Sequence, residues 1–574
     1  MNRPRSADFH VAGRSLAWSA QDRAAALAQA QSRDYPLVII GGGITGAGVA
    51  REAALRGIPF LLVDREDFAF GTSSRSSKLV HGGMRYLAQK EFRLVRESTT
   101  ERNWLCAALP NLVRPLAFHY CAYPGTRDTA KRVKTALRAY DLLGNAFSKY
   151  KLPRHRILTP AQLQESEPCM RTEGMELAGR YYDANVDDAR LTLEVIKEAR
   201  DFSGGRSLAL NYVQLEDLVI EADRVTAVKL VDRVTDQVFT VRTGCVVNAT
   251  GVWTSSILGL AGDRSEMIRP TKGVHLAVSN ARLGNRAAFV LRSLDDDRNF
   301  FVLRRGEITL IGTTDTDYPG DLAAPFCTRE DCDYLLRTVN ARFPEAALGD
   351  ADILSTYAGI RPLVRQEGVK ESAISRRHTI RDEHNGLVTI VGGKLTTFRT
   401  MAWDVLSVCC RQGYLRPLKG KEKHRNFSRR PLKAGLTWTA FTAALAELGL
   451  AGAAPEPQLR HLHQQYGQAA LTILQEIKAD PESGQPFLDG HPYCPAEIRH
   501  ILSFENAPTL MDVMLRRTEM QLMVSHLLQP ELAAQVAAIM AAFYGWDEPR
   551  LRSEQAVYLE YIQRTVQFLA VGHD

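Results

Sequence analysis

Three glycines in a GxGxxG spacing, Gly41, Gly43 and Gly46, follow the apolar run PLVII and precede a helix-forming stretch. The first glycine permits a tight turn, the second lets the backbone approach a pyrophosphate, and the third lets helix pack on strand. The helix N-terminus then offers free N–H groups to an anion. Asp64 ends the next apolar run, where a carboxylate can accept hydrogen bonds from ribose hydroxyls. This stretch predicts a dinucleotide site for an unphosphorylated ribose, as in FAD or NAD.

The next loop, DFAFGTSSRSSKLVHGGMRYL (67–87), is dense in glycine, serine, threonine and cations. Such a loop can follow an extended diphosphate to a reactive ring, whereas an NAD domain normally passes straight into another helix. Further strand-to-glycine turns occur in CVVNATGVW (245–253) and GLVTIVGGKLTTFRTMA (386–402). Backbone N–H groups at Gly392 and Gly393 suit the pyrimidine end of a flavin, where negative charge grows on reduction. Three converging turns favour FAD over NAD.

The residues predicted to contact FAD come from the glycine motif, the serine-rich loop and the two later turns. They are Gly41, Gly43, Gly46, Asp64, Thr72, Ser73, Ser74, His81, Gly82, Gly83, Ala249, Thr250, Gly251, Gly392, Gly393, Leu395 and Thr396. No metal site is predicted, because the acidic run at 295–297 lacks supporting ligands and is typical of a hairpin turn.

Five segments of the chain carry a further pattern. They are FGTSSRSSKLVHGGMRYL, ATGVW, IGTTDTDYPGD (311–321), YAGIRPL (357–363) and VGGKLTTFR (391–399). Together, over about 35–415, they resemble the FAD-dependent glycerol-3-phosphate dehydrogenases, the respiratory enzymes of the glycerol-phosphate shuttle. ENAPTLMDVMLRRTEM (505–520) is similar to that family's C-terminal helical domain. Thr45 and Glu52 stand where that family usually has Asn and Asp, and Asp64 stands where Glu is common in the wider FAD superfamily. These departures leave the implied reaction unchanged.

The resemblance implies that FAD takes a hydride from sn-glycerol 3-phosphate, giving dihydroxyacetone phosphate, and that the electrons pass to a membrane quinone. Some relatives use oxygen instead. A phosphomonoester substrate needs fixed cations, since Arg matches phosphate oxygens with a planar fork and Lys adds a point charge. The resemblance places four cations in the substrate pocket: Arg85, Arg361, Arg376 and Lys394. The alternative for each is a solvated surface cation. Tyr86 either donates to the phosphate or packs in the core.

Alcohol oxidation also needs a base for the hydroxyl proton, and histidine is the natural candidate near neutral pH. His275, in RPTKGVHLAV, is predicted to enter a strand and is the leading candidate. His81, just before Gly82 and Gly83, is the second, and either ring can instead serve a structural or flavin-contacting role. Arg361 near the reacting hydroxyl would stabilise alkoxide character and so belongs with the catalytic candidates.

The sequence also permits other functions. An amine or amino-acid oxidase of the same fold needs a carboxylate-binding Arg and an apolar side-chain pocket, whereas the surplus of cations in glycine turns favours phosphate. A basic FAD protein can also bind nucleic acid, and Tyr140, Phe147 and Tyr150 lie among cations. A non-enzymatic nucleotide sensor is the remaining class. The leading hypothesis is the dehydrogenase, with no nucleic-acid partner.

Alternation of short apolar runs with helical stretches up to about 415 predicts an α/β fold. We expect an FAD-binding Rossmann-like domain of the glutathione-reductase and amino-acid-oxidase type, an interwoven antiparallel-sheet substrate domain, and an all-helical cap. The expected segments are 35–110, 180–255 and 350–415 for the FAD-binding domain, 111–179 and 256–350 for the substrate domain, and 420–574 for the cap. Residues 223–244 are predicted to form a hairpin, and the cap is a candidate homodimer interface.

The 574 residues have a net charge of +7, and their nine cysteines form no CxxC pair, which favours a reducing compartment. The opening MNRPRSADFH has no apolar core of a signal peptide. Residues 434–454 carry a charge and predict a buried helix rather than a membrane span.

Residues 128–156 hold eight Lys or Arg and two Asp, with Val133, Leu137, Tyr140 and Leu143 near one helical face. A basic amphipathic helix can lie on anionic lipid, and the alternative is a solvated helix packed on the domain. The prediction is a cytoplasmic protein, peripheral on the inner face of the cytoplasmic membrane.

Overall fold

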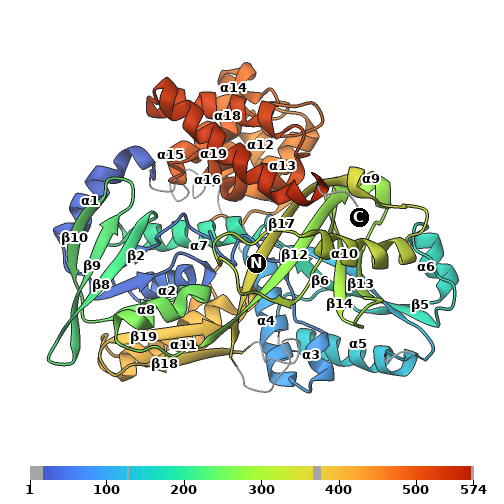
Figure 1. Cartoon of the computed structure of the whole chain (residues 1–574), viewed down its shortest axis with the longest axis horizontal. Helices are drawn as coiled ribbons and strands as arrows, with labels where there is room; N and C mark the ends of the chain where they lie inside the picture. The colour runs from blue at the N-terminus through green and yellow to red at the C-terminus, as the bar shows by residue number, and fades with distance from the viewer. Residues whose placement is uncertain (1–16, 126–127, 147, 366–376, 571–574) are drawn as a thin grey trace.

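The computed structural model describes residues 17–125, 128–146, 148–365 and 377–570. Figure 1 shows a body with two lobes, each built around a sheet, and a C-terminal helical part above them in orange and red. The candidate Arg376 and residues 1–16 lie outside the described residues. Each lobe combines strands that are far apart in the sequence.

The first lobe contains a six-stranded sheet in the described part of the chain, in the order β18-β19-β11-β1-β2-β7. Its strands are β1 (Leu37–Ile40), β2 (Phe60–Val63), β7 (Leu208–Leu210), β11 (Val246–Asn248), β18 (His378–Asp382) and β19 (Leu387–Gly392). All neighbours except β18 pair in parallel, and every residue of β1 and β2 is buried. Continuous apolar runs suit strands that are covered on both faces. This confirms the predicted α/β class.

Beside this sheet lies an antiparallel three-stranded sheet in the order β10-β9-β8. Its strands are β8 (Val213–Glu221), β9 (Arg224–Asp232) and β10 (Gln237–Arg242). The pairing of β9 with β10 confirms the hairpin predicted at 223–244.

The second lobe is built on a ten-stranded sheet. Its strands are β3 (Leu79–Val80), β4 (Arg114–Ala122), β5 (Arg156–Leu158), β6 (Leu177–Asn185), β12 (Ile268–Ser279), β13 (Ala288–Arg292), β14 (Asn299–Arg305), β15 (Ile308–Gly312), β16 (Thr316–Asp317) and β17 (Ile353–Val364). The acidic run at 295–297 joins β13 to β14 as a hairpin turn, as predicted. The expected assignment of 350–415 to the FAD-binding lobe is wrong for β17, because β17 pairs with β12 along its whole length. β3, inside the segment 35–110, also belongs to this sheet.

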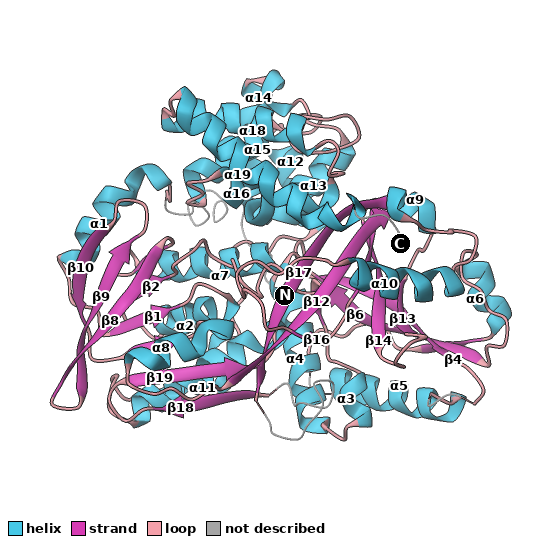
Figure 2. Ribbon diagram, in the orientation of Figure 1, coloured by secondary structure: helices cyan, strands magenta, loops and turns pink. Residues whose placement is uncertain are grey.

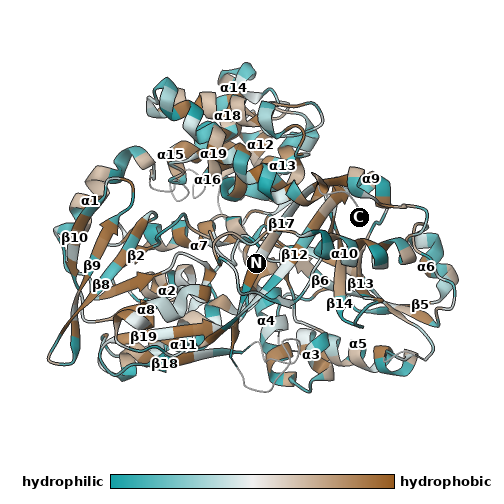
Figure 3. Ribbon diagram, viewed as in Figure 1, coloured by the Kyte–Doolittle hydropathy of each residue, from teal (hydrophilic) through white to brown (hydrophobic). Residues whose placement is uncertain are grey.

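Helices cover both sheets. Those of the body are α1 (Arg23–Gln31), α2 (Ile44–Leu55), α3 (Arg85–Ala88), α4 (Phe92–Ala108), α5 (Ala130–Asn145), α6 (Pro160–Ser166), α7 (Asp188–Ser203), α8 (Thr254–Leu260), α9 (Asn280–Leu283), α10 (Arg329–Arg342) and α11 (Phe398–Arg411). α2 and α11 approach closely, since a Cβ added to Gly48 would lie 2.8 Å from the ring of Phe398. Figure 3 shows the hydrophobic colour concentrated in the strands that these helices cover.

The C-terminal part is a helical cap, as Figure 2 shows. Its helices enclose an apolar core of their own. Its helices are α12 (Trp438–Glu447), α13 (Glu456–Tyr466), α14 (Ala470–Ala479), α15 (Pro495–Phe504), α16 (Leu510–Asp512), α17 (Met520–Met523), α18 (Gln529–Tyr544) and α19 (Glu548–Val566). In the described part of the chain, no helix combines the length and apolar character that a membrane crossing requires.

α5 turns its apolar face toward the protein. Val133, Leu137 and Tyr140 are at most 4% exposed, and the Leu137 side chain packs against β6 at Gly179. The face that was predicted to meet lipid is therefore covered by protein, which corrects that part of the expectation. All eight Lys and Arg of residues 128–156 remain exposed.

Candidate active site

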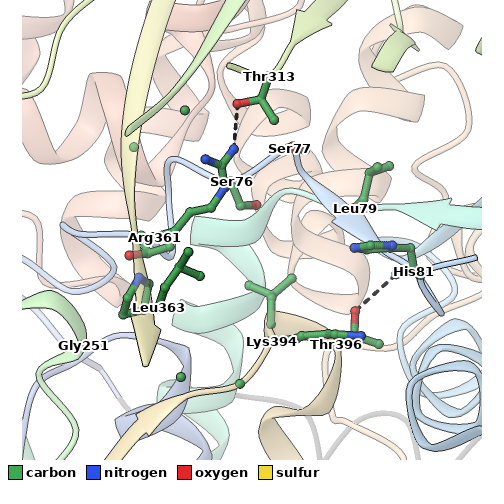
Figure 4. A pocket seen from close by; sticks show the side chains of 18 of the residues that line it. Ser76, Ser77, Leu79, His81, Gly251, Thr313, Arg361, Leu363, Lys394 and Thr396 are labelled. Carbon is green, nitrogen blue, oxygen red and sulfur yellow. Dashed lines mark hydrogen bonds between the residues drawn. The ribbon is translucent and has the colours of Figure 1, made fainter. Parts of the chain in front are cut away.

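A cavity of about 1490 Å³ collects residues from both lobes. Single ligand pockets usually measure about 300–1,000 Å³, so this volume can hold a dinucleotide together with a small substrate. Its lining combines the glycine turn after β1, the loop before β3, the ends of β11 and β19, and residues of β12 and β17. Figure 4 shows Arg361, His81, Lys394 and Thr396 around this space.

Most of the sequence-predicted cofactor residues line this cavity, but three of them do not. Gly46 lies behind the turn, where an added Cβ would be 1.9 Å from the carbonyl oxygen of Gly41. Its role is therefore close packing rather than ligand contact. The Gly82 backbone N–H is buried and donates to Tyr140 Oη and Asp183 Oδ1. Ser74 donates back to the carbonyl of Gly71 within its own loop.

The turn between β1 and α2 is fixed by side chains that arrive later in the chain. Gly41 has a φ of +105°, which L side chains rarely adopt, and a Cβ there would lie 2.7 Å from the Ala249 carbonyl oxygen. Ser73 Oγ accepts a hydrogen bond of 2.9 Å from Ile44 N at the start of α2. The serine-rich loop thus meets the helix N-terminus where the sequence predicted a pyrophosphate.

Asp64 closes the turn from the end of β2. Its carboxylate accepts from Gly42 N at 2.7 Å and from Glu66 N at 2.9 Å. Burial raises the pKa of Asp64 to about 7, although both hydrogen bonds act in the opposite direction. Asp64 also lines the cavity, at the end of β2 where a carboxylate can accept hydrogen bonds from a ribose.

The residues present fit FAD. A Cβ added to Gly251 would meet no atom within 4 Å, and its φ of +60° disfavours any side chain, so bare backbone adjoins the cavity there. Gly392 and Gly393 also have positive φ and line the same cavity. Glycine backbone that lines the cavity at three turns, together with Asp64, suits an extended dinucleotide.

His275 lies in β12 with its ring enclosed by two neighbours. Its Nε2 is 2.9 Å from Ser77 Oγ, and its ring stacks on Tyr357 with centroids 4.7 Å apart. Its Nδ1 has no hydrogen-bond partner among the described residues. Burial, aided by Arg361 and Lys78, lowers the pKa of His275 to about 3. The imidazole is therefore neutral at pH 7, which is the form in which a base acts.

Arg361, on β17, reaches across to the loop after β15. Its Nη1 donates to Asp315 Oδ1 at 2.9 Å and its Nη2 to Thr313 Oγ1 at 2.8 Å. Burial lowers the pKa of Arg361, with Asp315 opposing this effect. These bonds hold the guanidinium in the wall of the cavity.

Two further cations meet at one tyrosine. Arg85 Nη2 donates to Tyr86 Oη at 3.1 Å, and Lys394 Nζ lies 4.0 Å from the centroid of the Tyr86 ring. Lys394 also donates to Ser98 Oγ at 3.1 Å. Tyr86 is 3% exposed, so it packs in the core, which is one of the two alternatives predicted for it. It also joins the cation cluster. His81 lines the same cavity, and its backbone N donates to Thr396 Oγ1.

Sequence reasoning did not single out Ser77, Tyr357, Thr313 or Asp315. All four lie inside the sequence segments that carry the family resemblance, and membership of those segments is the signal that could have identified them. Their contacts depend on the pairing of β12 with β15 and β17, which brings His275 opposite Gly312 and Tyr357. No group of three or more His, Cys, Asp or Glu suited to a metal occurs among the described residues.

Comparison with known proteins adds family relationships. A profile described as FAD dependent oxidoreductase matches residues 36–399, and one described as the C-terminal domain of alpha-glycerophosphate oxidase matches 416–551. The chain is 35% identical over 548 residues to glycerol-3-phosphate dehydrogenase 2 of Mycobacterium tuberculosis, covering 95% of this chain and 91% of that one. It is 33% identical over 608 residues to an alpha-glycerophosphate oxidase of Streptococcus pyogenes, covering 94% and 97%. The crystal structure of glycerol-3-phosphate dehydrogenase from Bacillus halodurans complexed with FAD is similar with a TM-score of 0.77 and 30% identity, covering 96% and 99%.

Proposed function

This chain belongs to the FAD-dependent glycerol-3-phosphate dehydrogenase family, and we propose on that basis that it oxidises sn-glycerol 3-phosphate to dihydroxyacetone phosphate. The observation that carries the proposal is one cavity that combines a cation cluster, Arg85 with Lys394, and a neutral buried imidazole, His275. Cations suit a phosphomonoester, and the imidazole suits a hydroxyl proton. The same substrate stands in the names of the relatives.

The residues divide into four roles. Arg85, Tyr86 and Lys394 hold the phosphate, and Arg361 faces the reacting hydroxyl, where its charge stabilises developing alkoxide. His275 accepts the hydroxyl proton, while Ser77 and Tyr357 hold its ring in place. Bound FAD supplies the acceptor for the hydride that leaves the substrate carbon.

The cofactor is held by the residues that line the cavity. Gly41, Gly43 and the start of α2 receive the pyrophosphate, and Asp64 receives the ribose. His81, beside Thr396, is the second candidate base, and its position also suits a contact with the flavin. Arg376, predicted for the phosphate, lies outside the described residues.

We propose a quinone as the electron acceptor. The cavity lining includes the apolar side chains Met84, Leu87, Phe92, Val290 and Phe301, a surface that suits an apolar ring. Oxygen is the alternative, favoured by the relative that is named an oxidase. We also propose peripheral contact with an anionic membrane, which would bring a quinone within reach. The exposed cations of α5 and of the segment after it support this contact.

The test is anaerobic mixing of the purified holoprotein with sn-glycerol 3-phosphate while the visible absorbance of oxidised flavin is followed. Bleaching supports the proposed substrate and cofactor together. A protein that stays yellow with this substrate and bleaches with an amino acid contradicts the proposal. After bleaching, separate additions of a short-chain quinone and of oxygen identify the acceptor by the rate at which colour returns.

A further inference from the structure

The cap contacts the body next to the two residues that hold the ring of His275, Ser77 and Tyr357. Glu519, just before α17, lies 3.5 Å from Lys78 Nζ across the boundary between the cap and the body. Two residues of α17 contact β17: Leu522 O accepts from Ser355 Oγ at 2.9 Å, and Gln521 Nε2 donates to Thr356 O at 3.2 Å. Lys78 directly follows Ser77, and Thr356 directly precedes Tyr357. The cap therefore contacts the chain next to both residues.

The first support is the turn that carries Ser77. Lys78 has a left-handed φ of +53°, and its ammonium lies between Asp188, at 2.7 Å, and Glu519. Glu519 is also bound by Arg305, whose Nε donates to Oε1 at 3.1 Å. Burial disfavours the charged form of Glu519, but Arg305 and Lys78 more than offset this and lower its pKa. A fixed, ionised Glu519 therefore restrains Lys78 in a strained conformation next to the hydroxyl that bonds His275.

The second support is the ring of Tyr357, which stacks on His275. Tyr357 Oη donates to Ser76 O at 2.8 Å, so the strand and the loop are also joined to each other. Because Ser355 and Thr356 are both bonded to α17, the cap restrains this strand directly before Tyr357.

We infer that Glu519 is a positioning residue for proton transfer, and that the cap thereby takes part in catalysis through Lys78 and Ser77. The inference rests on the proposed function, with His275 as the base. It concerns the rate of the chemical step rather than substrate affinity, since Arg85 and Lys394 are held by Tyr86 and Ser98 instead. A small displacement of a base is costly to the rate, because proton transfer depends on geometry.

The experiment compares Glu519→Gln with Glu505→Gln in the full-length holoprotein. Glu505 is a matched control, because it is also a buried carboxylate of the cap bound to cations of the body, Arg190 at 2.5 Å and Lys197 at 3.2 Å. Among the described residues, its carboxylate makes no hydrogen bond or ion pair with the loop that carries Ser77. Flavin content, thermal stability, kcat and KM are measured for both with a soluble dye acceptor. We expect Glu519→Gln to lower kcat about tenfold with KM nearly unchanged, and Glu505→Gln to lower stability alone.

A double-mutant cycle with Ser77→Ala tests the route. The losses in kcat from Glu519→Gln and Ser77→Ala should be less than additive, because both act through the same hydroxyl. Glu519→Asp and Glu505→Asp repeat the comparison with charge retained, in case the amide variants do not fold. We expect Glu519→Asp to lose several-fold in kcat and Glu505→Asp to lose none. Equal kcat in the Gln pair, or in the Asp pair if the Gln variants do not fold, overturns the inference while wild-type turnover stands. A wild-type protein that does not turn over the substrate contradicts the proposed function itself.

Discussion

The imidazole of His275 lies nearly parallel to the phenol ring of Tyr357, with the two planes 10° apart and the centroids separated by 4.7 Å. Tyr357 covers one face of the ring while Ser77 Oγ bonds its edge. Tight enclosure fixes the ring's orientation and excludes water, which is why the neutral form is favoured.

Replacing His275 by Asn should remove the base. We expect kcat to fall about 100- to 10,000-fold, the range typical of general-base removal, with flavin content unchanged. The comparison variant is His81→Asn, which should mainly affect flavin retention or its absorbance spectrum. The measurement is rapid anaerobic reduction of the flavin by sn-glycerol 3-phosphate. If the rate of flavin reduction falls further in His81→Asn than in His275→Asn, His81 is the base and His275 has the other role.

The pH dependence of kcat should lack the acid limb of an ordinary histidine. Burial, with Arg361 and Lys78, lowers the pKa of His275 from 6.5 to about 3, so the ring stays unprotonated as the pH falls through 6.5. A base works in its unprotonated form, so kcat should persist below pH 6.5 and decline only at lower pH. Steady-state rates at saturating substrate from about pH 5 to 8 would check this, since that range spans the usual histidine pKa. An acid limb centred on pH 6.5 would contradict it.

Arg85→Gln should raise KM for sn-glycerol 3-phosphate by about tenfold or more, because a hydrogen bond to a charged group contributes about 1.5–3 kcal/mol. The effect on kcat should be smaller, since the phosphate lies away from the reacting carbon. Arg93→Gln provides the control, because Arg93 is exposed and does not line the cavity. Equal KM values for the two variants would remove Arg85 from the phosphate site.

Gly46→Ala should impair cofactor binding without any direct contact to the ligand. The added methyl would lie 1.9 Å from the Gly41 carbonyl oxygen, so the turn must shift at a cost of about 1–3 kcal/mol. We expect a lower ratio of flavin to protein and a lower melting temperature. Gly259→Ala is the matched control, because a Cβ there meets no atom within 4 Å. Full flavin retention in Gly46→Ala would show that the turn tolerates the shift.

Binding to anionic vesicles should depend on the exposed cations of α5. Lys134→Glu combined with Arg138→Glu should weaken sedimentation with phosphatidylserine vesicles by at least about tenfold, because each cation near the surface contributes about 1 kcal/mol. The control reverses Lys421 and Lys423, which are exposed and change the net charge equally. If both double variants bind equally, or the wild type does not sediment at low salt, α5 is not a membrane contact.

The sequence by itself determined the cofactor turn and the family. Gly41, Gly43 and Gly46 sit within one short strand–turn–helix unit, and its conformation depends on neighbours along the chain, so spacing alone was sufficient. The α/β class followed in the same way from the alternation of apolar runs.

Only the tertiary structure decided which residues surround His275 and which face of α5 is covered. Ser77 and Tyr357 reach His275 through the loop before β3 and the pairing of β12 with β17, both set by contacts between distant segments. A one-residue change of register would reverse the facing of every side chain in a strand, and local propensity does not fix that register. The apolar face of α5 was correctly identified from the spacing of its apolar residues. The same spacing, however, suits a helix that lies on lipid and a helix that packs on β6. The tertiary structure shows that β6, and not lipid, covers this face. Periodicity gives the direction of an apolar face but does not identify the surface that covers it.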